Sequence, residues 1–456
     1  MQRQRQILRP APLGQPEGRL QRGMKAVAAR HLDQRPARIG QALGARLRPA
    51  RPRVPAQPAG AEIPQRSAGQ VAAPAQPVTL QEDLRIVVQN QPALAADRMQ
   101  LDLAKADSKT AATFSNPVAH YSNKRGEKEW GVEQAIPIFG QRGMRIENAR
   151  LGEQAAAANS DVAVATTLSD AAHAFNELLV AQQRYQVWLA ARDELDKAGF
   201  IVKGQIEAGT RSRYDGARLN LQQAQMSMQV SKAQAALRDA AARVASIAAL
   251  PQWKVRVEGS LQATDLRKAP AYDQLWSTAQ TQLPSLRASQ AELDRARQKI
   301  KLEQREALPT PSFGLSRIRN SVDGSFNQVG VSVEIPLFDR RQGPIERAKV
   351  EADQAELRRD AAVLAAQSEL QRALQQLSLR RTAVRDYEKE GLAQIAPLHQ
   401  MAQDAYKLGK GTILELIDAL GSINEHRLEH LELVKDMLDA EWEVRLASGD
   451  LPQAQL

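Results

Sequence analysis

Two long stretches with almost no glycine or proline restrict the possible folds of this chain more than any other feature. They run from about Gly143 to about Phe200 and from Ile345 to Lys407, and both are rich in alanine, glutamine, leucine, glutamate and arginine. This composition is typical of long helices, which at about 1.5 Å per residue would be roughly 85–95 Å long. Because no single globular core is that wide, we expect the helices to pack side by side in a bundle or coiled coil.

Each long stretch ends at a compact turn, and a returning helix is expected directly after it. Gly209 and Gly409 lie in these turns and can end the outgoing helix. Ser212 and Thr412 follow them and are good N-caps for the returning helix. The pattern predicts antiparallel helical hairpins over 143–249 and 342–448.

Short alternating apolar segments precede each helical hairpin. They cover 118–122 and 130–137 in the first half and 312–318 and 329–336 in the second, with turn residues between the members of each pair. This pattern predicts two β-hairpins, over 117–137 and 311–336. An isolated sheet of these four strands would expose two edges, which invites pairing with further copies of the chain.

The two halves form an internal repeat. The first contains GVEQAIPIFGQRGMRIENA and the second GVSVEIPLFDRRQGPIERA, with Pro137 matching Pro336 at an offset of 199. We expect one unit over 78–257, which begins with a helix capped by Thr79 and Glu82. The second unit covers 258–456, opens with helices over 272–308 and ends in a C-terminal tail.

The first 77 residues have a different composition. They contain eleven of the 23 prolines and carry fourteen basic against three acidic residues, a net charge of +11, whereas the remainder carries 48 basic and 49 acidic residues, net −1. We expect either disorder or a misassigned start or reading frame that replaces a true signal sequence. A nucleic-acid-binding arm is disfavoured because no aromatic side chain is interleaved for base stacking.

Several functional classes receive no support from the sequence. The chain has no cysteine, so thiolate metal sites and disulfides are excluded. No glycine-rich phosphate loop follows a strand and no catalytic constellation is present, so we expect no enzyme activity and no cofactor. A cytosolic coiled-coil scaffold remains an alternative, but it does not explain a β-hairpin in each half.

From Val78 to Leu451 the order of elements resembles the TolC-like outer-membrane factor family, the exit ducts of tripartite efflux pumps. The resemblance rests on the opening helix, on the two tip turns and on the similar ends of the two halves: Leu80-x-x-x-Leu84, Asn90-x-Pro92, 207–212, 406–412, GKGTILELIDA at Gly409 to Ala419, 248–251 and 447–451. It implies a mainly helical chain with a small β part. The helical hairpins would build a periplasmic α-barrel, and the four strands would contribute to a trimeric, twelve-stranded outer-membrane β-barrel.

The resemblance also implies location and partners. The chain would be a homotrimer in the outer membrane of a Gram-negative bacterium, in contact with outer-membrane lipid and with its helices in the periplasm. A periplasmic adaptor and a proton-driven inner-membrane pump of the resistance-nodulation-division type would be its protein partners. No nucleic acid would be involved.

The same resemblance assigns candidate sites. Glu415 and Asp418 match the acidic positions of a cation-selective periplasmic constriction, although helix N-terminal charge complementarity is the simpler explanation. The helix tips would contact the adaptor through Gly209, Thr210, Ser212, Gly409, Lys410 and Thr412. The junction between barrel and helical tube is expected at Pro137, Phe139, Pro336 and Phe338, with the phenylalanines as interfacial anchors.

The exported substrate is the least constrained expectation. Arg142, Gly143 and Arg145 look like a basic pattern common in the heavy-metal branch of the family, which implies export of nickel, cobalt, cadmium and zinc. Multidrug export is the alternative. His426 and His430, four residues apart on a helix, are weak candidate metal ligands, because two ligands without a third usually form only a polar helix face.

Overall fold

The computed structural model describes residues 77–251, 255–259, 261, 271–321, 324–408 and 410–451, all within one compact unit that begins at Ser67. The expectations for residues 1–77, Pro77 excepted, and for Gly409 therefore lie outside the described residues.

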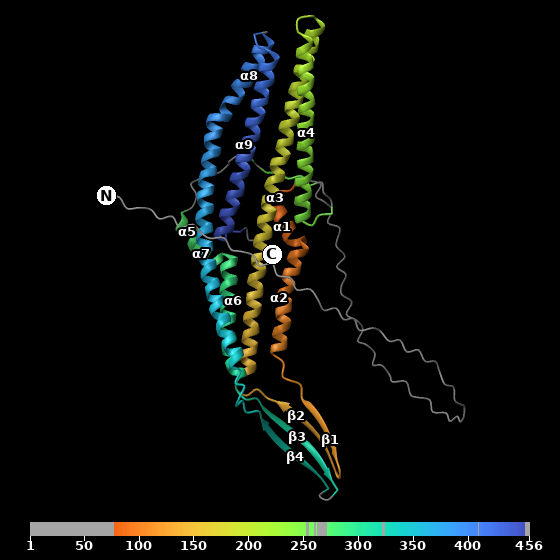
Figure 1. Ribbon diagram of the computed structural model, residues 1–456, viewed down its shortest axis with the longest axis vertical. Helices are drawn as coiled ribbons and strands as arrows, with labels where there is room; N and C mark the ends of the chain where they lie inside the picture. Colours follow the sequence, from red (N-terminus) through yellow and green to blue (C-terminus); the bar gives the residue numbers. More distant parts are fainter. Residues whose placement is uncertain are drawn as a thin grey trace, which may run out of the picture. The chain divides into compact units, whose positions relative to one another are not determined.

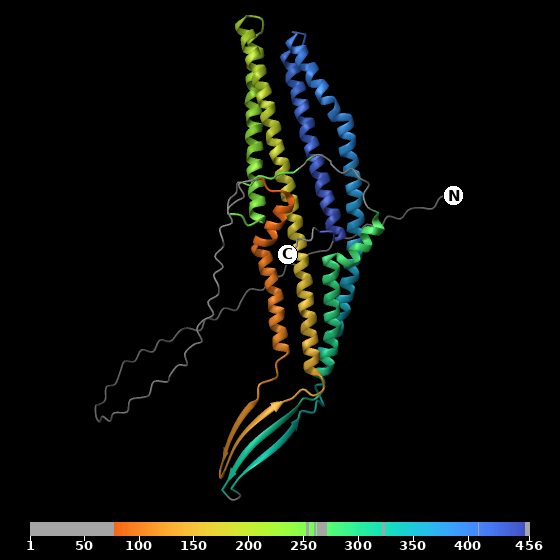
Figure 2. The same ribbon diagram turned by 180° about the vertical axis from the view of Figure 1, so that it is seen from behind.

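Long antiparallel helices dominate this unit. The first hairpin consists of α3 (Gln141–Glu207) and α4 (Arg213–Ile247). The second consists of α7 (Gln342–Tyr387), the π-helical turn η1 (Glu388–Leu392), α8 (Ala393–Lys407) and α9 (Ile413–Ser448). Both hairpins have their turns at the end of the unit far from the sheet (Figures 1 and 2). The expected fold class, mainly helical with four strands, is confirmed.

The second long helical stretch is not regularly α-helical over its whole length. Pro397 lies inside α8 and η1 ends five residues before it. Proline has no amide hydrogen and its ring crowds the carbonyl of the preceding turn, so one backbone hydrogen bond is missing within α8. The chain stays helical from Gln342 to Lys407, and the π-helical turn interrupts only the regular α-helical hydrogen bonding.

Shorter helices line the long ones. They are α1 (Leu80–Asn90), α2 (Pro92–Ala111), α5 (Tyr272–Gln282) and α6 (Pro284–Glu306). Pro92 begins α2 and Pro284 begins α6. Proline fits the first position of a helix, but it disfavours a helical conformation for the residue before it, so each proline separates two helices. The expected capping box of Thr79 and Glu82 is present at α1.

The four strands form one antiparallel sheet in chain order: β1 (Val118–Lys124), β2 (Glu127–Ala135), β3 (Pro311–Asn320) and β4 (Gly324–Val333). The halves of the repeat join through β2 and β3, where Trp130 pairs with Arg317. The strands reach further toward the hairpin turns than the alternation in the sequence suggested. Polar Lys124 and Glu127 still pair across β1 and β2, because backbone hydrogen bonding does not require an apolar side chain.

Apolar packing and one polar network hold the helices together. The alanine-rich face of α3 supplies Ala171, Ala172 and Ala174 to a buried cluster that also contains residues of α1 and α4. Asp439 on α9 accepts a 2.8 Å hydrogen bond from Asn176 on α3, and its other oxygen accepts one of 3.1 Å from Lys435. None of the helices in the described ranges combines the length and apolarity required to cross a membrane.

Candidate functional site

The tip of the first helical hairpin is a tight, exposed turn. Gly209 adopts a left-handed conformation with φ of 73° after the end of α3. The backbone N–H and the hydroxyl of Thr210 both donate to the Gln205 carbonyl at 2.9 Å. Ser212 caps α4 in a reciprocal box with Asp215. Local bonds therefore fix the turn and leave Gly209, Thr210 and Ser212 on the surface.

The second tip repeats this construction. The backbone N–H groups of Lys410 and Gly411 both donate to the Ala405 carbonyl at 2.9 Å, which ends α8. Thr412 caps α9 in a box with Glu415. Lys410 and Thr412 are exposed. The two halves of the repeat thus use the same capping chemistry, as the matching serine and threonine indicated.

A contact between the tips was not apparent from the sequence. The guanidinium of Arg211 lies 5.6 Å from the ring centre of Tyr406 and donates to the Gly411 carbonyl at 3.4 Å. Tyr406 is buried, and its hydroxyl donates to the Gln205 side chain at 3.4 Å. Below them, apolar residues from both hairpins pack in one cluster. Side chains from the two halves therefore hold the tips together.

The structure places Glu415 in the first turn of α9 and Asp418 in the second, and both residues are exposed. A Glu415 carboxylate oxygen accepts a hydrogen bond from the backbone N–H of Thr412 at 2.9 Å, so this carboxylate already stabilises the start of the helix. Asp418 has no side-chain partner among the residues that the structure describes. Glu415 is therefore engaged in the helix cap, whereas Asp418 is exposed to solvent.

His426 and His430 do not converge on one position. His430 Nε2 lies 3.0 Å from a carboxylate oxygen of Glu388, whereas His426 Nδ1 lies 2.8 Å from the Tyr387 hydroxyl. Within the described ranges, no group of three histidine or carboxylate side chains is arranged to hold a metal ion. The two histidines connect α9 to the region of η1.

The first junction between the sheet and the helices is built around a buried glutamine. Pro137 and Phe139 follow β2, and Gly140 adopts φ of 83° immediately before α3. The side-chain oxygen of Gln141 accepts from the Phe139 backbone N–H at 3.0 Å, and Gln141 is fully buried. Gln141 also donates through its side-chain amide to the Leu308 carbonyl at 3.4 Å, a contact between distant segments that the sequence did not reveal.

The second junction uses a similar glutamine and a more exposed aromatic ring. Gln342 accepts from the Arg340 backbone N–H at 2.8 Å, two residues upstream as in the first half. Pro336 lies beyond the end of β4, and Phe338 is 93% exposed. Such exposure of a large apolar side chain fits contact with a partner or a lipid.

The basic residues beside the first junction fasten neighbouring helices to each other. Arg142 donates two hydrogen bonds, of 2.9 and 2.7 Å, to the Ala112 carbonyl at the end of α2. Arg145 forms a bidentate ion pair with Glu306 at the end of α6. Its Nε and Nη2 donate to the two carboxylate oxygens at 2.6 and 2.9 Å. This hydrogen bonding raises the pKa of Arg145. The basic pattern therefore has a structural role at the point where sheet and helices meet.

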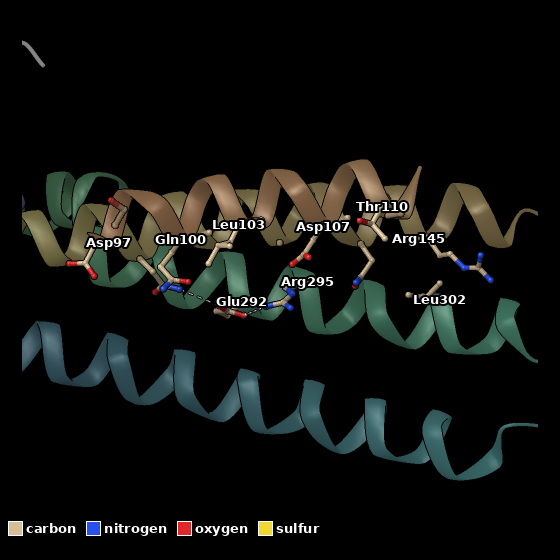
Figure 3. A pocket seen from close by; sticks show the side chains of 17 residues that line it. Asp97, Gln100, Leu103, Asp107, Thr110, Arg145, Glu292, Arg295 and Leu302 are labelled. Carbon is tan, nitrogen blue, oxygen red and sulfur yellow. Dashed lines mark hydrogen bonds and ion pairs between the residues drawn. The ribbon is translucent and has the colours of Figure 1, made fainter. Parts of the chain in front are cut away.

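A groove lies between α2, α3 and α6 near this junction (Figure 3). Asp97 and Asp107 line it together with Arg295 and Arg145. Glu292 accepts from Asn159 at 3.3 Å and pairs with Arg295 at 3.6 Å. Because its charges are mixed and its central carboxylate is partnered, the groove does not offer convergent ligands to a cation.

Comparisons with known proteins agree with this arrangement. Residues 275–450 match the family "Outer membrane efflux protein". The chain is 24% identical over 363 residues to the cobalt-zinc-cadmium resistance protein CzcC of Cupriavidus metallidurans, covering 78% of this chain and 86% of that protein. It is 24% identical over 328 residues to the nickel-cobalt-cadmium resistance protein NccC of Alcaligenes xylosoxydans xylosoxydans, covering 67% and 71%. The CmeC outer membrane channel of Campylobacter jejuni has a similar fold, with a TM-score of 0.68, 14% identity, and coverage of 81% of this chain and 85% of that one.

Proposed function

We propose that the chain, which matches the outer membrane efflux protein family over residues 275–450, is the outer-membrane channel of a tripartite system that exports divalent heavy-metal cations. Nickel, cobalt, cadmium and zinc are the substrates that we propose. The observation that carries the proposal is the similarity to CzcC over most of both chains. NccC, a second metal-resistance protein, supports the same substrate class.

The unpaired edges of the sheet support assembly as a homotrimer. Within the described sheet, β1 and β4 each pair on one side only. Three copies would supply twelve strands, and joining β4 of one copy to β1 of the next would close a barrel without free edges. The long helices would then form a tube in the periplasm. The channel itself would be passive, with a proton-driven inner-membrane pump supplying the energy.

The helix tips would contact a periplasmic adaptor. Their turns lie at the end of the unit far from the sheet (Figure 1). Gly209, Thr210, Ser212, Lys410 and Thr412 are exposed there. We extend this role to Gly409 from the sequence, because it stands 200 positions after Gly209. Pro137, Phe139, Pro336 and Phe338 would mark the membrane-to-periplasm junction.

Deletion of the gene is expected to sensitise the cell to nickel, cobalt, cadmium and zinc, because cations delivered by the pump would no longer reach the exterior. Growth across a concentration series of each metal measures the effect, with the plasmid-borne gene as the complementation control. Metal resistance equal to wild type would contradict the proposal. Sensitivity to drugs alone would favour multidrug export, and a soluble protein that forms no heat-modifiable oligomer in the outer-membrane fraction would favour the cytosolic scaffold.

Glu415 and Asp418 would form two acidic rings at the periplasmic constriction of the trimer. The double variant Glu415→Gln/Asp418→Asn is expected to weaken block by polyvalent cations severalfold in planar bilayers, since carboxylate rings favour cations at a narrow point. Glutamine can replace glutamate in the capping box, so the start of α9 should persist.

Asp215→Asn is the matched control for the constriction, because Asp215 occupies the corresponding capping position at the first tip. Single-channel conductance and the half-blocking cation concentration should remain near wild type in this variant. The constriction role fails if the double variant conducts and is blocked like wild type.

A further inference from the structure

The two faces of the sheet differ in polarity over the half nearer the helices, whereas Ile318 and Phe326 make the second face partly apolar toward the hairpin ends. Side chains that share a level across antiparallel strands point to the same face, so the register defines both faces. One level of the first face contains Ala119, Val132, Leu315 and Val329, and further apolar residues continue this face toward the helices: Phe313, Val331 and Val333. The opposite face carries His120, Glu129, Glu133, Ser316, Gln328 and Ser332. We call the first of these the apolar face.

The apolar face changes its chemistry toward the hairpin ends that lie away from the helices (Figure 1). At the next level Tyr121 and Trp130 form an aromatic pair with ring centres 5.8 Å apart, and Trp130 lies opposite Arg317. One level further, Lys128 lies directly opposite Arg319. Lys128, Arg317 and Arg319 form what we call the basic cluster.

The basic cluster has no internal charge compensation in the described sheet. All three side chains are exposed, and none has a hydrogen-bond or ion-pair partner among the described residues. The nearby carboxylates, Glu127 and Glu129, belong to the opposite face by the same register. Like charges directly opposite each other on neighbouring strands are destabilising. An anion held between the strands would remove this repulsion.

The neighbours of the cluster indicate the kind of anion. An exposed apolar band suits lipid tails, an aromatic pair suits the level where tails meet headgroups, and a guanidinium fork suits phosphate. These three chemistries follow one another along one face of the sheet in the order that a lipid presents them. A soluble anion would need the basic cluster but would not need the apolar and aromatic residues beneath it.

We propose that the basic cluster binds the phosphate groups of outer-leaflet lipids, with the Tyr121–Trp130 pair packed against the base of the headgroup. This rests on the proposed function for the location of the sheet in the outer membrane. The site would anchor the hairpin ends to phosphorylated glycolipid and fix the depth of the sheet in the membrane. It is separate from the solute path, which would run along the opposite face.

The test uses the purified full-length oligomer in detergent and bisphosphorylated lipid A as the probe, with binding followed by native mass spectrometry. We expect Lys128→Gln/Arg317→Gln/Arg319→Gln to weaken binding at least tenfold. Lys124→Gln/Arg125→Gln/Arg340→Gln removes the same charge outside the basic cluster and should bind within about twofold of wild type. Wild-type protein should bind dephosphorylated lipid A as weakly as the cluster variant binds the intact lipid.

Equal binding by the cluster variant and wild type would overturn the proposal. An equal loss in the control variant would do so as well, because net charge rather than the cluster would then be responsible. If the triple variant does not assemble, the comparison of intact and dephosphorylated lipid A on the wild-type protein decides the question. Equal binding of the two lipids would exclude recognition of the phosphate groups. Metal resistance is measured separately in cells, so failure of lipid binding would leave the proposed export function standing.

Discussion

Asp83→Asn is expected to stabilise the folded protein at pH 8 and to change its stability little near pH 4. Asp83 lies in the first turn of α1 with 2% of its surface exposed, and burial raises its pKa to about 7. In an unfolded chain the pKa would be about 3.9. The folded state therefore binds more protons between these values, and stability falls as the pH rises from about 4 to about 7.

The size of the effect on the free energy of unfolding follows from the shift of the Asp83 pKa to about 7. About three pKa units correspond to roughly 4 kcal/mol per chain as an upper bound. Asparagine has nearly the same shape and no charge to bury, so it should recover much of that amount above pH 7. Thermal unfolding in detergent at a fixed scan rate, at pH 5 and pH 8, measures the difference.

The exposed Asp239 on α4 provides the control. Asp239→Asn should change the unfolding midpoint equally little at both pH values. A midpoint gain for Asp83→Asn that does not grow between pH 5 and pH 8 would contradict the assignment of a buried, uncompensated carboxyl group.

Gly449→Ala is expected to destabilise the end of α9 by about 2–3 kcal/mol. Gly449 adopts φ of 73°, which costs an alanine roughly 1–2 kcal/mol. An added Cβ would also lie 3.0 Å from the backbone nitrogen of Leu283 and 3.1 Å from the carbonyl carbon of Gln282. Because both atoms belong to the backbone between α5 and α6, the crowding cannot be relieved by a side-chain rotation.

The first half of the repeat contains the matched position. Ala249 follows α4 with φ of 50°, a left-handed conformation that alanine adopts at a cost. Ala249→Gly is expected to raise stability by about 0.5–1 kcal/mol, because glycine carries no such penalty. Urea unfolding of Gly449→Ala and of Ala249→Gly measures the change in the free energy of unfolding in each variant. Effects of the same sign at 249 and 449 would contradict the conformational argument.

Local features of the fold could be predicted from the sequence because they depend on neighbouring residues. The capping residues Thr79, Ser212 and Thr412 are all confirmed, since a cap requires only a hydroxyl at the right place before a helix. The repeat also predicted matching turns in both halves. The π-helical turn η1, which ends five residues before Pro397, was not predicted.

Contacts between distant segments could not be read in the same way. Arg211 and Tyr406 meet only because two separate helical hairpins lie together at their tips. Gln141 looked like an ordinary polar residue at a helix start, yet the fold buries it completely. The functional proposal for Glu415 and Asp418 came from resemblance and remains a prediction, and the structure adds that Glu415 also caps α9.

The order of the strands has a consequence for how copies of this chain can associate. In the part of the chain that the structure describes, the free edges of the sheet belong to β1 and β4, which differ in sequence and lie at opposite sides of the sheet. Pairing one with the other is head-to-tail, so a growing assembly always keeps one edge of each kind until the ring closes. A subunit with an obstructed β4 could still accept a neighbour at β1 and would then leave the ring open. A minority of such subunits would therefore disable more rings than their own share of the population.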